Sequence, residues 1–227
     1  SINIYNLASN SIMRSIAHFL SALFHPLLFP TYGAIYITFF APHFFAQLSP
    51  KAFQLSVIVI FILTFIFPVV SLMLMRKLDL IPSLTLEDKK DRVIPFISIA
   101  TFYIWTFFYY KPSYRLPFAN PLIASMMLGS VIATFVAFFI NIFRKISLHT
   151  IAAGGWIGFM LGTMQYTVYD IGILIPLFVV LAGLIGTARL ILKAHEPKEI
   201  IQGYLVGFIS QFVAFTIVPY FQLLFNN

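Results

Sequence analysis

Residues 171–207 have the sequence IGILIPLFVVLAGLIGTARLILKAHEPKEIIQGYLVG, in which a short polar junction separates two apolar stretches. The first stretch, Ile171 to Ala188, carries no charge and approaches the ~20 apolar residues that a membrane-spanning helix needs. Arg189 follows it directly, and an ionisable side chain there costs on the order of 2.5–3.5 kcal/mol if it stays in hydrocarbon. Pro197 suits the first position of the next helix. We therefore predict two membrane helices whose polar junction has a function.

The composition extends this prediction to all 227 residues. Hydrophobic residues make up 60% of the chain and charged residues only 9%, which is outside the range of soluble globular domains. We expect an all-α fold, a polytopic transmembrane helix bundle of about six to seven spans that forms a single domain over residues 1–227. Residues 1–11 lack the pattern of a signal peptide. Without cysteine, the chain has no disulfide and no thiolate ligand.

The chain is basic, with a formal net charge of +7 and a pI of about 9.7. Its basic residues stand between apolar segments, where anionic head groups or membrane topology explain them more simply than nucleic acid does. We therefore expect the lipid bilayer as a partner and no nucleic acid. The sequence leaves the oligomeric state open.

Seven apolar segments are candidate membrane spans. They cover approximately residues 15–41, 53–75, 93–110, 117–143, 151–168, 171–193 and 197–225. His25-Pro26 and Pro30 interrupt the first segment, so we expect it to be kinked or divided into two shorter helices. We interpret His25 as a structural residue that bonds a carbonyl group freed by this kink.

Gly154, Gly158 and Gly162 lie four residues apart on the fifth segment. This spacing puts them on one helix face and predicts the close approach of another helix, in preference to a ligand role.

Three polar positions, around Arg92, His149 and His195, are each separated by two predicted spans. An even number of crossings returns the chain to the same membrane face. The three positions can therefore form one site.

His195 stands two residues before Pro197, and Glu199 follows it by four. A carboxylate at this spacing can reach the imidazole, fix its tautomer and leave the other nitrogen as a nucleophile or base. The start of the last helix adds N–H groups and a partial positive charge that suit an anion. The alternative is structural, with Glu199 complementing the helix dipole and His195 lying at the membrane interface.

Basic residues near this junction are candidates for phosphate binding. Arg189 and Lys193 are four residues apart, and we expect them to present two cations toward one face. Arginine can hold two phosphate oxygens at once, although both side chains can instead extend to lipid head groups. Arg92 is a third candidate because it ends a charged loop directly before an apolar segment.

Ser147-Leu148-His149-Thr150 opens the fifth segment. Ser147 suits a helix N-cap. In a functional interpretation, Ser147 and the first free N–H groups bind phosphate, and His149 donates a proton to a leaving oxygen.

A metal site is not expected. Asp88 and Asp91 would need a second acidic cluster to hold magnesium diphosphate, and the other acidic residues are scattered. We expect no metal and no other cofactor.

Together these residues resemble the three signatures of the type 2 phosphatidic acid phosphatase family, membrane enzymes related to vanadium haloperoxidases. The third signature, Ser-Arg, five residues, His, three residues, Asp, is similar to Ala188-Arg189, His195 and Glu199. The second, Pro-Ser-Gly-His, is similar to Ile146-Ser147-Leu148-His149.

The first signature, Lys, six residues, Arg-Pro, is matched only at its arginine. Arg92 fits, but Thr85 stands at the lysine position and Val93 replaces the proline. A lysine from elsewhere would have to replace the missing one, and the candidates are Lys89, Lys90 and Lys193.

The resemblance implies a fold with the family's helical core and a set of catalytic roles. His195 would attack phosphorus and carry a phosphohistidine, Glu199 would orient it, and His149 would protonate the leaving alcohol. Arg92, Ser147 and Arg189 would hold the phosphoryl oxygens and stabilise the transition state without a metal.

The expected function is that of an integral membrane lipid phosphatase, hydrolysing a phosphomonoester or diphosphate lipid. One alternative is a catalytically inactive relative that binds or moves lipids, which the poor first signature favours. Another is a membrane transferase that passes phosphate or an isoprenoid to a second substrate.

The distribution of basic residues predicts the side of the membrane. Apart from the possible site residues, seven lie on the predicted site face and three on the other. The positive-inside rule then puts the site on the cytoplasmic face of a bacterial inner membrane. Many bacterial members of the family are thought to act on the outer face.

Overall fold

The computed structural model describes residues 11–45, 50–83, 88, 90–111 and 120–225. Thr85, Lys89 and most of the opening segment 1–11 lie outside these residues. The elements in chain order are α2 (Ser11–Leu23), η1 (Pro26–Leu28), α3 (Phe29–Phe40), η2 (Pro42–Phe45), α4 (Pro50–Phe61), η3 (Ile62–Ile66), α5 (Phe67–Lys77), η4 (Lys90–Arg92), α6 (Val93–Tyr110), α7 (Pro121–Phe143), α8 (Leu148–Thr163), η5 (Met164–Tyr166), α9 (Leu174–Ile191) and α10 (Pro197–Phe225).

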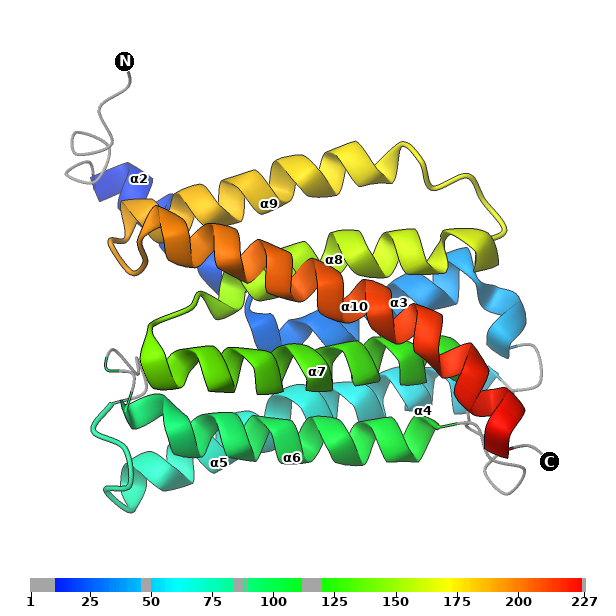
Figure 1. The fold of residues 1–227 in the computed structure, drawn as a ribbon, viewed down its shortest axis with the longest axis horizontal. Helices are drawn as coiled ribbons and strands as arrows, with labels where there is room; N and C mark the ends of the chain where they lie inside the picture. Colours follow the sequence, from blue (N-terminus) through cyan, green and yellow to red (C-terminus); the bar gives the residue numbers. More distant parts are fainter. Residues whose placement is uncertain (1–10, 46–49, 84–87, 89, 112–119, 226–227) are drawn as a thin grey trace.

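The described residues are 85% helical and contain no strand, as the apolar composition predicts. Among them, six helical segments are long and apolar enough to cross a membrane. The helix of the predicted fifth span, α8, is not one of these six, because it has only 16 residues and spans about 24 Å at 1.5 Å per residue. It packs inside the bundle against α7, α9 and α10. The protein is therefore an integral membrane helix bundle of the predicted size (Figure 1).

The three predicted polar positions lie at the same end of the bundle, as counting the spans predicts. Figure 1 shows the end of α5, the start of α6 and the connections from α7 to α8 and from α9 to α10 at one end of the bundle, beside α2. Arg92, His149 and His195 lie in or beside these connections. The end of α6, the start of α7 and the connection from α8 to α9 lie at the opposite end.

The first span is divided, as its prolines predict. The helix α2 ends at Leu23, the short turn η1 begins at Pro26, and α3 continues to Phe40. The detail predicted for His25 is wrong, because its Nδ1 does not bond a freed carbonyl. It accepts a hydrogen bond from the Leu27 N–H at 3.3 Å and so caps η1.

The glycine face of the fifth segment packs against α10, which confirms its predicted role. A side-chain carbon on Gly154 or Gly158 would overlap the α10 backbone at Tyr204 and Phe208. On the other helix, a carbon on Gly207 would overlap the α8 backbone at Ile151. This α8–α10 interface holds the helices that begin beside His149 and His195 in fixed register.

Candidate functional site

A cavity of about 230 Å³ opens in the bundle between residues of α3, α5, α6, α7, α8, α9, α10, η1 and η4. Residues from all three predicted polar positions line it. The lining residues that can carry charge or exchange protons at neutral pH are His25, Arg92, His149, Arg189 and His195. Helices far apart in the sequence thus bring four of the predicted site residues together, with His25 in addition.

His195 is held at the junction of α9 and α10 by Glu199. Its Nδ1–H donates to the Glu199 carboxylate at 2.7 Å, and the two side chains are 5% and 18% exposed. The same carboxylate oxygen accepts a hydrogen bond from the Glu196 N–H at 3.3 Å. Glu199 therefore also caps the N-terminus of α10. The predicted pairing is confirmed, and it leaves Nε2 as the unprotonated nitrogen of the neutral ring.

The turn before His195 has a defined geometry. The Ala194 N–H bonds the carbonyl of Arg189 at 3.1 Å, and the Lys193 N–H bonds that of Leu190 at 2.9 Å, the pattern of a Schellman motif. Lys193 takes the left-handed conformation that this motif requires, with φ 52°. The prediction that Lys193 shares a face with Arg189 is wrong, because α9 ends at Ile191 and Lys193 is exposed.

The surroundings of His195 favour its neutral form. Burial lowers its pKa below the ordinary value, and the positive charges of Arg189 and Arg92 act in the same direction. The hydrogen bond and charge of Glu199 oppose this shift without cancelling it. A neutral imidazole with a free Nε2 is the state that a nucleophile or a base requires.

Ser21 of α2 holds two of the cavity residues. Its carbonyl accepts from Nε2–H of His149 at 3.0 Å, which leaves Nδ1 as the nitrogen of that ring able to exchange a proton. Its hydroxyl accepts from Nη1 of Arg189 at 3.1 Å. Nε of Arg189 is buried and has no hydrogen-bond partner among the described residues, so this donor suits an anion in the cavity.

Arg92 reaches the cavity from the start of α6. Its Nη1 donates to the carbonyl of Ile146 at 3.4 Å. Ile146 directly precedes Ser147, the N-cap of α8. The charged residues of the lining are thus two arginines, Arg92 at the end of η4 and Arg189 on α9. Two cations that face one cavity repel each other, and a bound anion would relieve this repulsion.

Three predicted phosphate-binding residues lie outside the cavity lining. Ser147 is fully buried, and its hydroxyl accepts from the Thr150 N–H at 3.4 Å, so its interpretation as the N-cap of α8 is confirmed. Lys90 is exposed on η4, and Lys193 is exposed in the turn after α9. Within the described residues no lysine lines the cavity.

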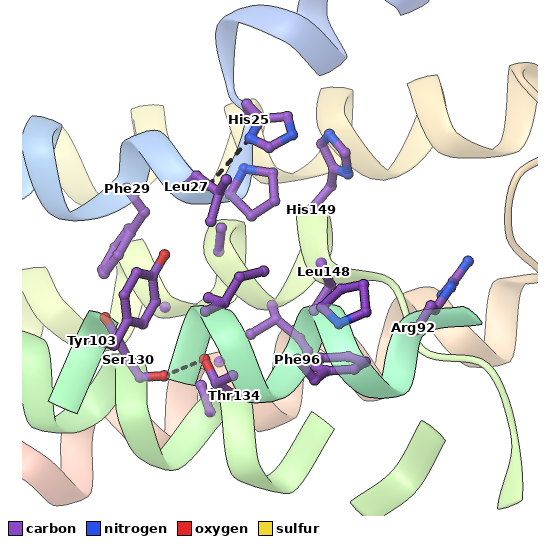
Figure 2. Close-up of a pocket in the computed structure, with 18 of the residues that line it drawn as sticks. His25, Leu27, Phe29, Arg92, Phe96, Tyr103, Ser130, Thr134, Leu148 and His149 are labelled. Atoms are coloured by element: carbon purple, nitrogen blue, oxygen red, sulfur yellow. Dashed lines mark hydrogen bonds between the residues drawn. The ribbon is translucent and has the colours of Figure 1, made fainter. Parts of the chain in front are cut away.

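The rest of the cavity is mainly apolar. Tyr103 lies 11 residues after Arg92, which is about 16 Å along α6, and Phe96 and Ile99 line the wall between them. Figure 2 shows Arg92 and Tyr103 at opposite ends, with Phe96 between them. Ser130 and Thr134 of α7 also line the cavity. The cavity therefore combines a cationic end with an apolar interior.

His25 is the site residue that sequence reasoning missed. Its ring packs edge-on against that of His149 with centroids 5.7 Å apart (Figure 2). A histidine beside a proline inside an apolar span was the available signal. Its direction could not be predicted, because it depends on how α2 folds back beside α8 and α9.

Comparison of the chain with models of known protein families, with curated protein sequences and with solved structures gives no match.

Proposed function

We propose that this protein is an integral membrane phosphatase that releases inorganic phosphate from a phosphorylated lipid through a phosphohistidine on His195. The observation that carries the proposal is the convergence of His195, His149, Arg92 and Arg189 on one cavity. A paired imidazole can act as a nucleophile, a second imidazole can transfer a proton, and two guanidinium groups can stabilise the charge of a phosphoryl group.

In the first step Nε2 of His195 attacks phosphorus, and the bond from phosphorus to the lipid oxygen breaks. The negative charge of the bound phosphate favours protonation of His149 at Nδ1, and the ring then gives this proton to the departing alcohol while Ser21 retains the Nε2–H. Arg92 and Arg189 stabilise the charge that spreads over the phosphoryl oxygens. Glu199 keeps the Nδ1 proton of His195 in place throughout.

In the second step neutral His149 takes a proton from water at Nδ1, and the hydroxyl group attacks phosphorus. The bond from phosphorus to Nε2 breaks, phosphate leaves, and both histidines return to their starting states. The balance is one phosphorylated lipid and one water giving one alcohol and one phosphate.

The apolar interior supports a lipid as the substrate. Phe96, Ile99 and Tyr103 extend the wall away from the arginines, so a hydrocarbon chain can lie there while its phosphate meets the cations. Burial of apolar area contributes about 25 cal/mol per Å², which favours a long-chain substrate over a soluble phosphate ester. We place the site at the cytoplasmic face of a bacterial inner membrane, because the basic residues favour that side.

The test uses the purified protein in detergent with phosphatidic acid, phosphatidylglycerol phosphate and an isoprenyl diphosphate, and measures released phosphate. We expect hydrolysis of at least one substrate, reduced by roughly 10³-fold or more in His195→Ala because the nucleophile is lost. His18→Ala is the matched control, since His18 is exposed on α2 and is absent from the cavity lining. Activity that survives His195→Ala excludes His195 as the nucleophile.

A second candidate function is lipid binding without catalysis. The observation that favours it is that no lysine lines the cavity in the described part of the chain. This function predicts that phosphatidic acid binds and that no phosphate is released. Adding an acceptor alcohol to the same assay separates hydrolysis from transfer, because a transferase forms a phosphorylated acceptor.

A further inference from the structure

The break in the first span brings a third histidine into the cavity. His25 lies between α2 and η1 and lines the cavity together with His149, Arg189 and His195. Pro26 directly after it fixes the backbone at the start of η1. The position of the ring is therefore set by the fold, and the ring is not a mobile side chain at the lipid surface.

The hydrogen bonds of His25 define which nitrogen can act. Nδ1 accepts from the Leu27 N–H at 3.3 Å, so in the neutral ring the proton is on Nε2. Nε2 has no hydrogen-bond partner among the described residues. Figure 2 shows the ring with Nδ1 toward Leu27 and the other side of the ring toward His149. His25 thus presents an N–H donor at the end of the cavity where His149 lies.

Two further N–H groups near this donor are held by Ser21. Nε2–H of His149 and Nη1 of Arg189 both bond Ser21, four residues before His25. The buried Nε of Arg189 is a further donor without a partner in the described chain. Nε2–H of His25 and Nε–H of Arg189 are thus two N–H donors on one cavity without a partner among the described residues, and together they fit an anion with multiple oxygens.

We propose that His25 is a phosphate-binding residue, whose Nε2–H donates to a phosphoryl oxygen held by Arg189. This inference rests on the proposed function for the identity of the anion and adds a residue from the first span to the site. The first span would then supply both Ser21, which positions Arg189 and His149, and His25, which contacts the ligand.

Two substitutions separate this role from the capping of η1. In His25→Asn the amide oxygen can replace Nδ1 as the cap acceptor, but nothing occupies the Nε2 position. In His25→Gln the longer side chain can place an amide N–H near the Nε2 position, but the cap acceptor is lost. His25→Ala removes both functions, and His18→Ala again serves as the matched control.

The measurement is calorimetric binding of inorganic phosphate to the full-length protein in detergent, with the melting temperature of each variant measured beside it. We expect His25→Asn and His25→Ala to raise the Kd for phosphate roughly tenfold, since a hydrogen bond to a charged group is lost. His25→Gln should stay within about threefold of the unmodified protein. If phosphate affinity is unchanged in His25→Asn, which keeps the cap acceptor, and is weakened in His25→Gln, which loses it, the proposal is overturned.

The remaining outcomes are equally decisive. Unchanged affinity in all three variants, equal losses in Asn and Gln, or no phosphate binding by the unmodified protein each reject the role of His25. Hydrolysis of phosphatidic acid in the same preparations separates the two proposals. Hydrolysis that depends on His195 but not on His25 leaves the proposed function standing without this inference. Phosphate binding that depends on His25 without any hydrolysis supports the inference and rejects the hydrolytic function.

Discussion

Two histidines at proline interruptions line the same cavity, yet their hydrogen bonds give them opposite chemistry. At the junction of α9 and α10, Nδ1–H of His195 donates to Glu199 at 2.7 Å. At the break between α2 and η1, Nδ1 of His25 accepts from the Leu27 N–H at 3.3 Å. The first ring is left with a lone pair on Nε2, and the second is left with a proton there.

The difference shows that the partner of one ring nitrogen decides what the other nitrogen can do. A carboxylate at the fourth position of the same helix start makes His195 a nucleophile or base. A backbone N–H in a proline-initiated turn makes His25 a donor. Sequence spacing reveals the carboxylate, since Glu199 follows His195 by four residues, but it does not reveal the backbone partner.

The largest expected effect comes from removing the carboxylate. Glu199→Gln should lower kcat/KM for phosphatidic acid by roughly 10²-fold or more, because the amide neither fixes the tautomer nor stabilises positive charge on His195. His25→Asn should act mainly on KM. Glu196→Gln is the control, since Glu196 is exposed and its backbone N–H remains. A kcat/KM for Glu199→Gln within threefold of the unmodified protein would show that the Glu199 carboxylate does not give His195 a chemical role different from that of His25.

The next effect tests whether the α8–α10 interface holds the two histidines at one cavity. A side-chain carbon on Gly207 would overlap backbone atoms of Ile151 and Gly155. Gly207→Ala should lower the free energy of unfolding by about 1–3 kcal/mol, measured in detergent, and should reduce activity as the helices separate. Gly183→Ala is the matched change on α9, where a side-chain carbon meets nothing within 4 Å. Equal melting temperatures for the two variants would contradict the packing role of Gly207.

The smallest effect is a change in proton affinity at His195. Burial and the two arginines lower its pKa, so NMR titration with ¹³C-labelled histidine should give a midpoint below the ordinary value of about 6.5. Glu199 acts in the opposite direction, so the midpoint should fall further in Glu199→Gln. The signal is assigned by its loss in His195→Ala. A midpoint above 6.5 would mean that the carboxylate outweighs burial, and His195 would then be protonated at neutral pH more often than a nucleophile requires.

The parts of the fold that follow from local patterns could be predicted from the sequence. The predicted spans 93–110 and 197–225 agree with α6 and α10, because charged residues or proline mark their starts. The sequence predicts that the fifth span begins near Ile151, whereas α8 begins at Leu148, since the Ser147 cap starts the helix earlier. The common face of three connections followed from counting crossings.

The parts of the site that depend on long-range packing could not be predicted. Ser21 bonds His149 and Arg189 across 128 and 168 residues, and no local pattern indicates either contact. Lys193 was predicted on the face of Arg189, but the chain leaves the helix at Leu192 and the side chain turns to solvent. Helical spacing therefore predicts contacts only while the helix continues.

Trapping of the covalent intermediate tests the central claim most directly. The protein is mixed with phosphatidic acid labelled with ³²P in its phosphate group, quenched with alkali within the first turnover, digested, and analysed by peptide mass spectrometry. We predict one acid-labile, base-stable phosphohistidine on His195, absent in His195→Ala. Phosphate on another residue would contradict the assignment of His195 as the nucleophile. In His149→Ala the breakdown of the phosphohistidine should be slow, so phosphate release by this variant without labelled protein would contradict it too.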